Sequence, residues 1–444
     1  MSNTDSALFS TTALPTVAWG KGSYVYDRDG KQYVDGSGGA AIFCLGHGHQ
    51  EVNEAIKAQL DRIAHGYRYH FTSEPLAELQ AIIARQCGGD LNQVIFVTSG
   101  SEAVESCLKI ALQYHDAIGE RSRRRFIARQ RSWHGNTLGA LSVSGHVGRR
   151  RPFEGSLLDA SFLSPANAYR PPKGVVVEKI ADYCAAELEQ EILRLGPETV
   201  SAFIFEPVVG AAGGVVPAPP DYAQRMQEIC RKYGVLMIAD EVMCGCGRTG
   251  TWRALAYDGL EPDLMAIAKG LAGGYIPLGA AVFQGHIGQT ILAKQGQFLT
   301  GHTFTGHTAA CAAGVAVQKI IEREKLAEKV AATGEWLKKT LQAELGDHPH
   351  VGDIRGRGFF VGVEFVEDKE RKRPFDPSLK LFNRIHNQTL ANGLICYPVG
   401  GIVDGIAGDA VILSPPYNAS GAELEEIVDK LVLSCRAALT QIVP

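Results

Sequence analysis

The chain of 444 residues contains the stretch Pro262-Asp263-Leu264-Met265-Ala266-Ile267-Ala268-Lys269-Gly270. Its apolar run, bounded by Pro and Gly, predicts a short buried strand, and Lys269 follows directly after that strand. A lysine in such a place is either a surface residue or a functional one. If it is partly desolvated its pKa falls, and the neutral amine can then form an imine and move protons. Gly270 would let a bound group approach the backbone.

A second apolar run, Val235-Leu236-Met237-Ile238-Ala239, lies about 30 residues earlier and ends in Asp240 and Glu241. Parallel α/β sheets bind ligands at the carboxyl ends of their strands, so Asp240 is a candidate binding residue. From the residues alone it could hold a metal, a ribose or a protonated ring nitrogen. An ordinary capping or salt-bridged aspartate is the competing interpretation.

A third segment, Val97-Thr98-Ser99-Gly100-Ser101-Glu102-Ala103, places glycine and hydroxyl residues between a predicted strand and a predicted helix. The N-terminus of a helix offers unpaired N–H groups and a positive dipole end, which suit a phosphate. The competing interpretation is a plain helix start capped by Ser99 or Ser101.

One cofactor needs all three of these features. Pyridoxal 5'-phosphate has a phosphate, a ring nitrogen that needs an acidic partner, and an aldehyde that reacts with a lysine. Trp133 adds an aromatic plane that can stack on such a ring, although a tryptophan packed in the core is the simpler interpretation of that residue alone.

Short apolar strands alternate with helices around these segments, which predicts an α/β fold with a mostly parallel sheet covered on both faces. We expect a large cofactor-binding domain over residues 61–315. Residues 316–444 begin with a long charged helix near 324–345 and predict a smaller α+β domain. Residues 1–60, with a hairpin around Asp27-Arg28-Asp29-Gly30, are expected to pack with that smaller domain.

Composition excludes several classes of protein. The net charge is −4, so no basic field exists to bind nucleic acid or an anionic membrane. We expect the cluster Arg121, Arg123, Arg124 and Arg125 and the run Arg149–Arg151 to be surface or loop charges. The N-terminus lacks the pattern of a signal peptide, no apolar run spans a membrane, and ten scattered cysteines suggest reduced thiols, so we expect a cytoplasmic protein. No metal site is expected, because Cys244 and Cys246 lack two further ligands at zinc spacing.

The chain resembles the class III (omega-amino acid type) aminotransferases of pyridoxal-phosphate fold type I from Tyr24 to about Tyr417. The resemblance is carried by several motifs, the most specific being Pro262–Leu264 with Ala268-Lys269-Gly270-Leu271-Ala272-Gly273-Gly274. The others are Leu45-Gly46-His47-Gly48-His49, Ser99–Ala103, Trp133-His134-Gly135-Asn136-Thr137, Phe205-Glu206-Pro207-Val208, Asp240-Glu241-Val242, Gly247-Arg248-Thr249-Gly250 and Gly301–His307.

The resemblance implies a role for each matching position. Lys269 would be the Schiff-base lysine and proton shuttle, and Asp240 would pair with the ring nitrogen. The remaining cofactor contacts would come from Gly100 and Ser101 at the phosphate, Trp133 and Val242 on the two ring faces, and Thr303 from a neighbouring subunit. A large domain with a sheet of the seven-stranded type and a homodimer are implied as well.

The expected activity is transfer of an amino group from an amine or amino acid to a 2-oxo acid, in two stages. A racemase, decarboxylase or aminomutase on the same scaffold is the alternative, and a non-enzymatic phosphate-binding protein is a third class. The chain departs from many relatives in lacking an arginine in Gly400–Gly408, before Ser414-Pro415-Pro416, where the acceptor carboxylate would bind. Small residues, Gly38–Ala41, also stand where relatives often have an aromatic. Arg68 is our candidate for the carboxylate.

Overall fold

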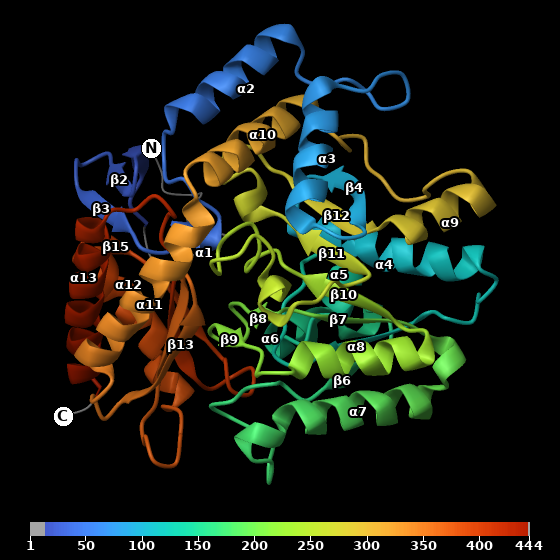
Figure 1. The fold of residues 1–444 in the computed structure, drawn as a ribbon. Coiled ribbons are helices and arrows are strands. Elements are labelled where there is room, and N and C mark those ends of the chain that lie inside the picture. The colour runs from blue at the N-terminus through green and yellow to red at the C-terminus, as the bar shows by residue number, and fades with distance from the viewer. Residues whose placement is uncertain (1–13, 443–444) are drawn as a thin grey trace.

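A computed structural model describes residues 14–442, and its largest element is a seven-stranded sheet (Figure 1). Six strands run in one direction, and only β12 runs the other way, antiparallel to both of its neighbours, β11 and β4. The strand order is β4 (Leu91–Val97), β12 (Gly279–Gln284), β11 (Leu264–Ile267), β10 (Leu236–Asp240), β7 (Val200–Phe205), β5 (Arg125–Arg129) and β6 (Ala160–Leu163).

Helices cover both faces of this sheet. Side chains alternate in direction along each strand, so each strand contributes residues to the cores on both faces. In β7, Phe203 and Phe205 pack into one core, whereas Ala202 and Ile204 pack into the other. The first face is covered by α3 (Glu74–Cys87), α7 (Ile180–Leu195), α8 (Tyr222–Tyr233) and α10 (Thr308–Arg323). The second is covered by α4 (Gly100–Ala117), α5 (Leu138–Ser142) and α9 (Gly285–Gln295).

A second part of the molecule holds its own core beside the large sheet. Its sheet has the order β13 (Val351–Arg357), β14 (Phe360–Phe365), β17 (Asp409–Leu413) and β16 (Tyr397–Gly400). Helices α11 (Leu326–Leu345), α12 (Leu381–Ala391) and α13 (Gly421–Thr440) belong to the same part.

The N-terminal strands join this second part. β1 (Val17–Lys21), β2 (Tyr24–Asp27) and β3 (Gln32–Asp35) form a meander, and β3 pairs in parallel with β15 (Leu394–Ile395). The short α1 (Gly38–Ala41) and α2 (Gln50–Arg62) lead from the meander to the large sheet, and β8 (Val208–Val209) and β9 (Val216–Pro217) form a small ribbon. The predicted domain boundaries near residues 60 and 315 stay a prediction.

The α/β fold with a mostly parallel sheet is confirmed, while three local predictions need correction. The residue type and position of Ser73, directly before α3, predict a helix cap, but its hydroxyl makes no capping hydrogen bond. The alternation of strands and helices predicts a helix after Gly135, and the structure has only the five-residue α5 there. Two arginines predicted to be surface charges are not exposed: Arg150 is half-buried and donates to the carbonyl oxygens of Leu141, Ser142 and Ser144, and Arg123 is buried and donates to those of Pro197 and Val200.

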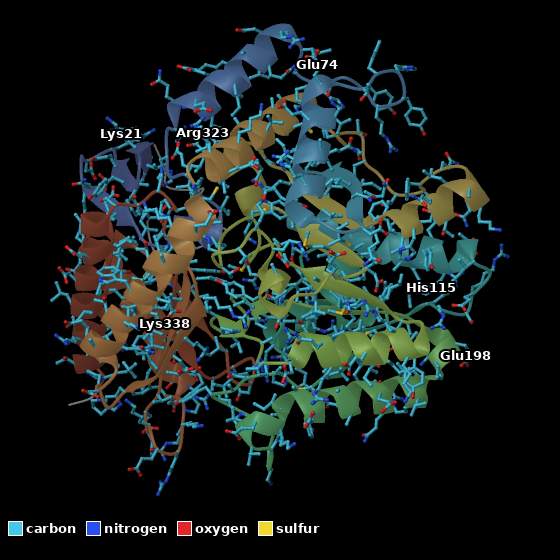
Figure 2. All side chains as sticks on the ribbon, viewed as in Figure 1. Lys21, Glu74, His115, Glu198, Arg323 and Lys338 are labelled. Atoms are coloured by element: carbon cyan, nitrogen blue, oxygen red, sulfur yellow. The ribbon has the colours of Figure 1, made fainter. Side chains whose placement is uncertain are left out.

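Charged ends such as those of Glu74 and Arg323 lie at the periphery (Figure 2). All ten cysteines are buried as free thiols. Among the described residues no helix combines the length and the apolar character that a membrane crossing requires. The sequence interpretation of the first thirteen residues lies outside the described part of the chain.

Candidate active site

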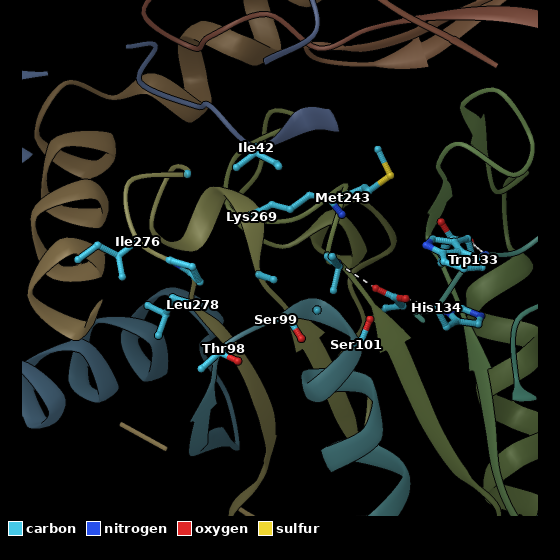
Figure 3. A pocket seen from close by; sticks show the side chains of 18 residues that line it. Ile42, Thr98, Ser99, Ser101, Trp133, His134, Met243, Lys269, Ile276 and Leu278 are labelled. Carbon is cyan, nitrogen blue, oxygen red and sulfur yellow. Dashed lines mark hydrogen bonds and ion pairs between the residues drawn. The ribbon is translucent and has the colours of Figure 1, made fainter. Parts of the chain in front are cut away.

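The carboxyl ends of the parallel strands meet at one edge of the large sheet and line a cavity of about 380 Å³ (Figure 3). Asp240 ends β10, and Lys269 follows the neighbouring strand β11. Of the seven predicted site residues, the cavity brings together Gly100, Ser101, Trp133, Asp240, Val242 and Lys269. The topology therefore places residues that are far apart in the sequence around one space.

Asp240 is held by two hydrogen bonds and is almost fully buried, with 3% of its surface exposed. Its Oδ1 accepts from the backbone N–H of Val242 at 3.0 Å, and its Oδ2 lies 2.7 Å from Nδ1 of His134. Because Nδ1 faces a carboxylate, we assign the proton to this nitrogen. The carboxylate thus keeps one orientation and its negative charge stays available to the cavity.

Lys269 is the cation of the site, and burial controls its chemistry. Desolvation lowers the pKa of its amino group, and the carboxylates of Asp240 and Glu206 oppose part of that shift. Its backbone has φ +46, in the left-handed region that non-glycine residues rarely adopt. A lysine with a lowered pKa supplies the neutral amine that a nucleophile or a general base requires.

Glu206 follows β7 and is a functional-site residue to which the sequence assigned no role. Its Oε1 accepts from the backbone N–H of Trp133 at 2.9 Å, and its Oε2 accepts from that of Gly210 at 2.8 Å. Burial raises its pKa, while the nearby His134 opposes that shift. Glu206 therefore fixes the backbone that carries Trp133.

Glu241, which follows Asp240 directly, binds backbone N–H groups and does not line the cavity. Its two oxygens accept from the backbone N–H groups of Ala254 at 2.6 Å and Leu255 at 3.0 Å. Burial raises its pKa to about 7. The sequence pattern could not separate the roles of the two adjacent carboxylates, and the structure does so by their partners.

The N-terminus of α4 forms the other side of the cavity. Ser99 is the cap, its Oγ accepting from the N–H of Glu102 at 3.1 Å, so the first N–H groups of the helix, at Gly100 and Ser101, have no intrahelical acceptor. A Cβ on Gly100 would lie 2.8 Å from Cγ1 of Val242. Glycine is required at that position, and the resulting space borders N–H groups that favour an anion.

Thr303, the seventh predicted residue, is exposed and does not line the cavity of its own chain. Its carbonyl oxygen lies 3.2 Å from Nε2 of His65. Arg68 lies in the same region, close to the backbone of Gly301, and also does not line the cavity. Large apolar side chains are exposed around them, namely those of Tyr67, Tyr69, Phe71, Leu299 and Phe304.

Arg149 is exposed, as the sequence predicted, and it lies next to the site. Its Cζ is 4.3 Å from the centroid of the Trp133 ring, a cation–π contact. It also lines a neighbouring cavity with the backbone of Gly400, Gly401 and Gly405, the loop that lacks an arginine. Apolar side chains of Ile42 and Met243 complete the wall of the main cavity.

These groups fit pyridoxal phosphate. The first turn of α4 suits its phosphate, the buried carboxylate of Asp240 suits a protonated ring nitrogen, and Lys269 suits its aldehyde. The cavity volume is within the range of sites for ligands of that size. The fold and the site together define an enzyme that depends on pyridoxal phosphate.

Comparison with known proteins shows to which family of pyridoxal-phosphate enzymes the chain belongs. The model of the family "Aminotransferase class-III" matches residues 10–434. An aminotransferase of Gibberella zeae is 42% identical over 417 residues, which cover 93% of this chain and 82% of the relative. The uncharacterized aminotransferase YodT of Bacillus subtilis is 39% identical, with 94% of each chain covered.

A solved structure agrees with these relatives. The (S)-enantioselective omega-transaminase of Thermomicrobium roseum superposes with a TM-score of 0.91 at 32% identity, covering 100% of this chain and 96% of that one. The chain therefore belongs to the class III aminotransferase family and is a pyridoxal-phosphate-dependent transaminase. Nothing in the comparisons favours the racemase, decarboxylase or aminomutase alternative.

Proposed function

We propose that this transaminase works with Lys269 as the residue that carries the cofactor covalently and moves the proton at the substrate. Pyridoxal phosphate supplies an aldehyde that combines with amines and a ring that accepts electron pairs. The observation that carries the proposal is the position of Lys269, desolvated, after the strand that neighbours the strand of Asp240, in the cavity that both residues line.

The other residues bind and orient. Asp240 holds a proton on the ring nitrogen, because a carboxylate beside a cationic group favours the charged form. The N–H groups of Gly100 and Ser101 bind the phosphate, while Trp133 and Val242 contact the two ring faces. His134 keeps Asp240 in place. Ile42 and Met243 exclude water from the reacting atoms.

We propose a homodimer in which Thr303 reaches the phosphate site of the partner subunit. Thr303 is exposed here, and the apolar side chains exposed around it, including Phe71 at 68% and Leu299 at 65%, are the kind of surface that a partner covers. A two-fold arrangement would use this surface twice. The ten free thiols support a cytoplasmic protein.

The substrates are an amine or amino acid and a 2-oxo acid, and the acceptor carboxylate needs a cation because burying it unpaired is costly. Two arginines are available for this role. Arg68 would act from the region of Thr303, across the dimer interface. Arg149 would act from its own chain, where it contacts the Trp133 ring. The geometry favours Arg149.

The test separates the two halves of the reaction. Amine alone should convert the enzyme to the pyridoxamine form once per site, and a 2-oxo acid alone should restore it, which gives ping-pong kinetics. Borohydride should fix the cofactor to Lys269 in the wild type but not in Lys269→Ala. Reduced cofactor on another lysine, or repeated turnover of one amino compound without acceptor, would overturn the proposal.

A further inference from the structure

Tyr417, a buried residue of the second part of the molecule, contacts the backbone directly after Lys269. Only 1% of its surface is exposed, and it packs in the core of that part. A Cβ placed on Gly270 would lie 3.4 Å from Oη of Tyr417, and one placed on Gly247 would lie 3.2 Å from its Cε2. Gly270 belongs to the turn that follows β11, and Gly247 belongs to the loop that follows β10. One ring therefore contacts the loops at the carboxyl ends of both strands.

Arg248, from the loop that follows β10, fixes the ring of Tyr417. Its Cζ is 4.6 Å from the ring centroid, a cation–π contact, and both side chains are buried. Burial raises the pKa of the Tyr417 hydroxyl, so the ring stays a neutral phenol. Nη1 of Arg248 donates to the carbonyl oxygens of Phe359 at 3.3 Å and Pro415 at 2.5 Å. Arg248 thus binds the second part of the molecule, including Tyr417, to the loop beyond Asp240.

The chain around Tyr417 is also attached to a segment that forms a wall of the cofactor cavity. Oγ of Ser414 donates to the carbonyl oxygen of Ser37 at 2.6 Å. The backbone N–H of Tyr417 donates to the carbonyl oxygen of Cys44 at 2.8 Å. Ile42, which lies between these two attachment points in the sequence, lines the cavity. The position of Tyr417 is therefore fixed relative to the cavity by backbone contacts as well as by its ring.

Lys269 needs support of this kind because of its backbone conformation. Its φ of +46 lies in the left-handed region, which is unfavourable for a residue with a side chain and persists only where neighbouring contacts maintain it. The contact between Tyr417 and Gly270 acts on the peptide unit that adjoins Lys269. A shift of that peptide unit would turn the Cα–Cβ bond of Lys269 and move its amino group relative to the cavity.

We propose that Tyr417, held by Arg248, is a positioning residue that sets the orientation of Lys269 and with it the reactivity of the lysine amine. This inference rests on the role proposed for Lys269 as the cofactor-carrying residue. It adds that the second part of the molecule contributes to the reaction through the backbone, since Tyr417 does not line the cofactor cavity. The ring makes both the cation–π contact and the contact with Gly247, so loss of the ring should have the largest effect.

The experiment compares Tyr417→Leu with Phe365→Leu, a matched control that removes an equally buried ring from β14 in the same core. Both variants should lose stability in thermal unfolding, because each leaves a cavity. Only Tyr417→Leu should alter Lys269. The pKa of the Lys269 amine is measured in the apoenzyme by pH-dependent labelling with acetic anhydride and mass spectrometry. In Tyr417→Leu this pKa should rise towards the ordinary value of lysine, because a displaced amine is better solvated.

A second measurement uses the cofactor-loaded enzyme. In Tyr417→Leu, kcat of the amine half-reaction should fall about tenfold or more, since contacts that maintain a strained backbone have effects of that size. KM should change little, because Tyr417 does not line the cavity in which the substrate reacts. Tyr417→Phe keeps the ring on Arg248 and should recover most of the rate. Phe365→Leu should keep the wild-type kcat.

An unchanged pKa of Lys269 in a folded Tyr417→Leu variant, or an equal change in Phe365→Leu, would overturn the inference. Should Tyr417→Leu fail to fold, Arg248→Lys is judged by the same two criteria, since an ammonium keeps the charge but lacks the planar face of a guanidinium. Borohydride should fix the cofactor to Lys269 in every folded variant. Its failure to do so in the wild type would contradict the proposed function, whereas intact fixation with an unchanged pKa contradicts only the positioning role of Tyr417.

Discussion

The contact between His134 and Asp240 offers the sharpest test of the site. Both side chains are almost completely buried, and Nδ1 of His134 lies 2.7 Å from Oδ2 of Asp240. The other ring nitrogen, Nε2, is buried without a partner among the described residues, so the ring serves Asp240 alone. His134→Phe keeps a ring of similar shape and removes the donor.

The size of the effect follows from the kind of hydrogen bond. A hydrogen bond to a charged group contributes about 1.5–3 kcal/mol. At about 1.4 kcal/mol per factor of ten, its loss corresponds to a rate about 10- to 100-fold lower. The loss should appear in kcat of the amine half-reaction, because the proposed role of Asp240 is to act on the bound cofactor and not on free substrate. His134→Gln, whose amide can donate, should recover part of the rate.

The assay is a stopped-flow measurement of the conversion to the pyridoxamine form, with thermal unfolding of each variant as the control for stability. A His134→Phe enzyme that is folded and reacts at the wild-type rate would refute the reasoning. So would a His134→Gln variant that is no faster than His134→Phe although both unfold at the wild-type temperature.

Four further predictions follow from the same geometry. Asp240→Asn should still bind the cofactor but react about 1,000-fold more slowly, because two unit charges about 4 Å apart interact by about 4 kcal/mol at an effective dielectric of 20; a near-normal rate in stopped flow would exclude Asp240 from the mechanism. Thr303→Ala should lose cofactor faster on dialysis with little change in Tm, and an active monomer in sedimentation would contradict the dimer. Glu241 has a folded pKa of about 7, above its ordinary value of 4.5, so its contribution to stability is complete below pH 4.5 and is lost as the pH rises through 7. That loss amounts to about 3 kcal/mol, and Glu241→Gln should flatten the pH profile of unfolding over this range. Arg149→Ala should raise KM for 2-oxo acids more than Arg68→Ala does, and the reverse order in steady-state kinetics would assign the carboxylate to Arg68.

The sequence predicted the buried strands well because their signal is local. Ala202–Phe205, Leu236–Ala239 and Leu264–Ile267 are uninterrupted apolar runs, and such runs occur in strands that are covered on both faces. The antiparallel direction of β12 left no mark in its residues, since strand direction depends on its pairing with β11 and β4. Direction is a property of the assembled sheet.

Helix α7 was missed although a signal exists for it. Ile180, Cys184, Leu188 and Ile192 are buried and recur every four residues, which is the helical pattern. β6, with the sequence Ala-Ser-Phe-Leu, is a half-buried edge strand without an apolar run. Edge elements contribute fewer apolar positions, so pattern analysis finds them last.

The supporting residues of the site had no local signal. His134 and Asp240 are 106 residues apart, and Glu206 and Trp133 are 73 apart, so only the folded sheet brings each pair together. Lys269 and Asp240 could be predicted as cavity residues because α/β sheets bind ligands at the carboxyl ends of their strands. Their partners could not, since a buried histidine and a buried glutamate have many structural uses.

The position of Lys269 depends on elements far from the cofactor cavity. A non-glycine residue in the left-handed region costs about 1–3 kcal/mol, and surrounding contacts must hold it there. The backbone after Lys269 is held by Gln318 of α10, whose Nε2 donates to the carbonyl oxygens of Gly270 at 3.1 Å and Leu271 at 2.9 Å.

Gln318 is itself fixed, because its Oε1 accepts from Nε1 of Trp252 at 2.8 Å and only 1% of its surface is exposed. Helix α10 begins at Thr308, five residues after Thr303, so one continuous element runs from the proposed dimer surface to the backbone beside the lysine. A change at that surface that shifts α10 would therefore alter the strained backbone at Lys269. In the proposed dimer, assembly would therefore be coupled to the reactivity of the lysine through this helix.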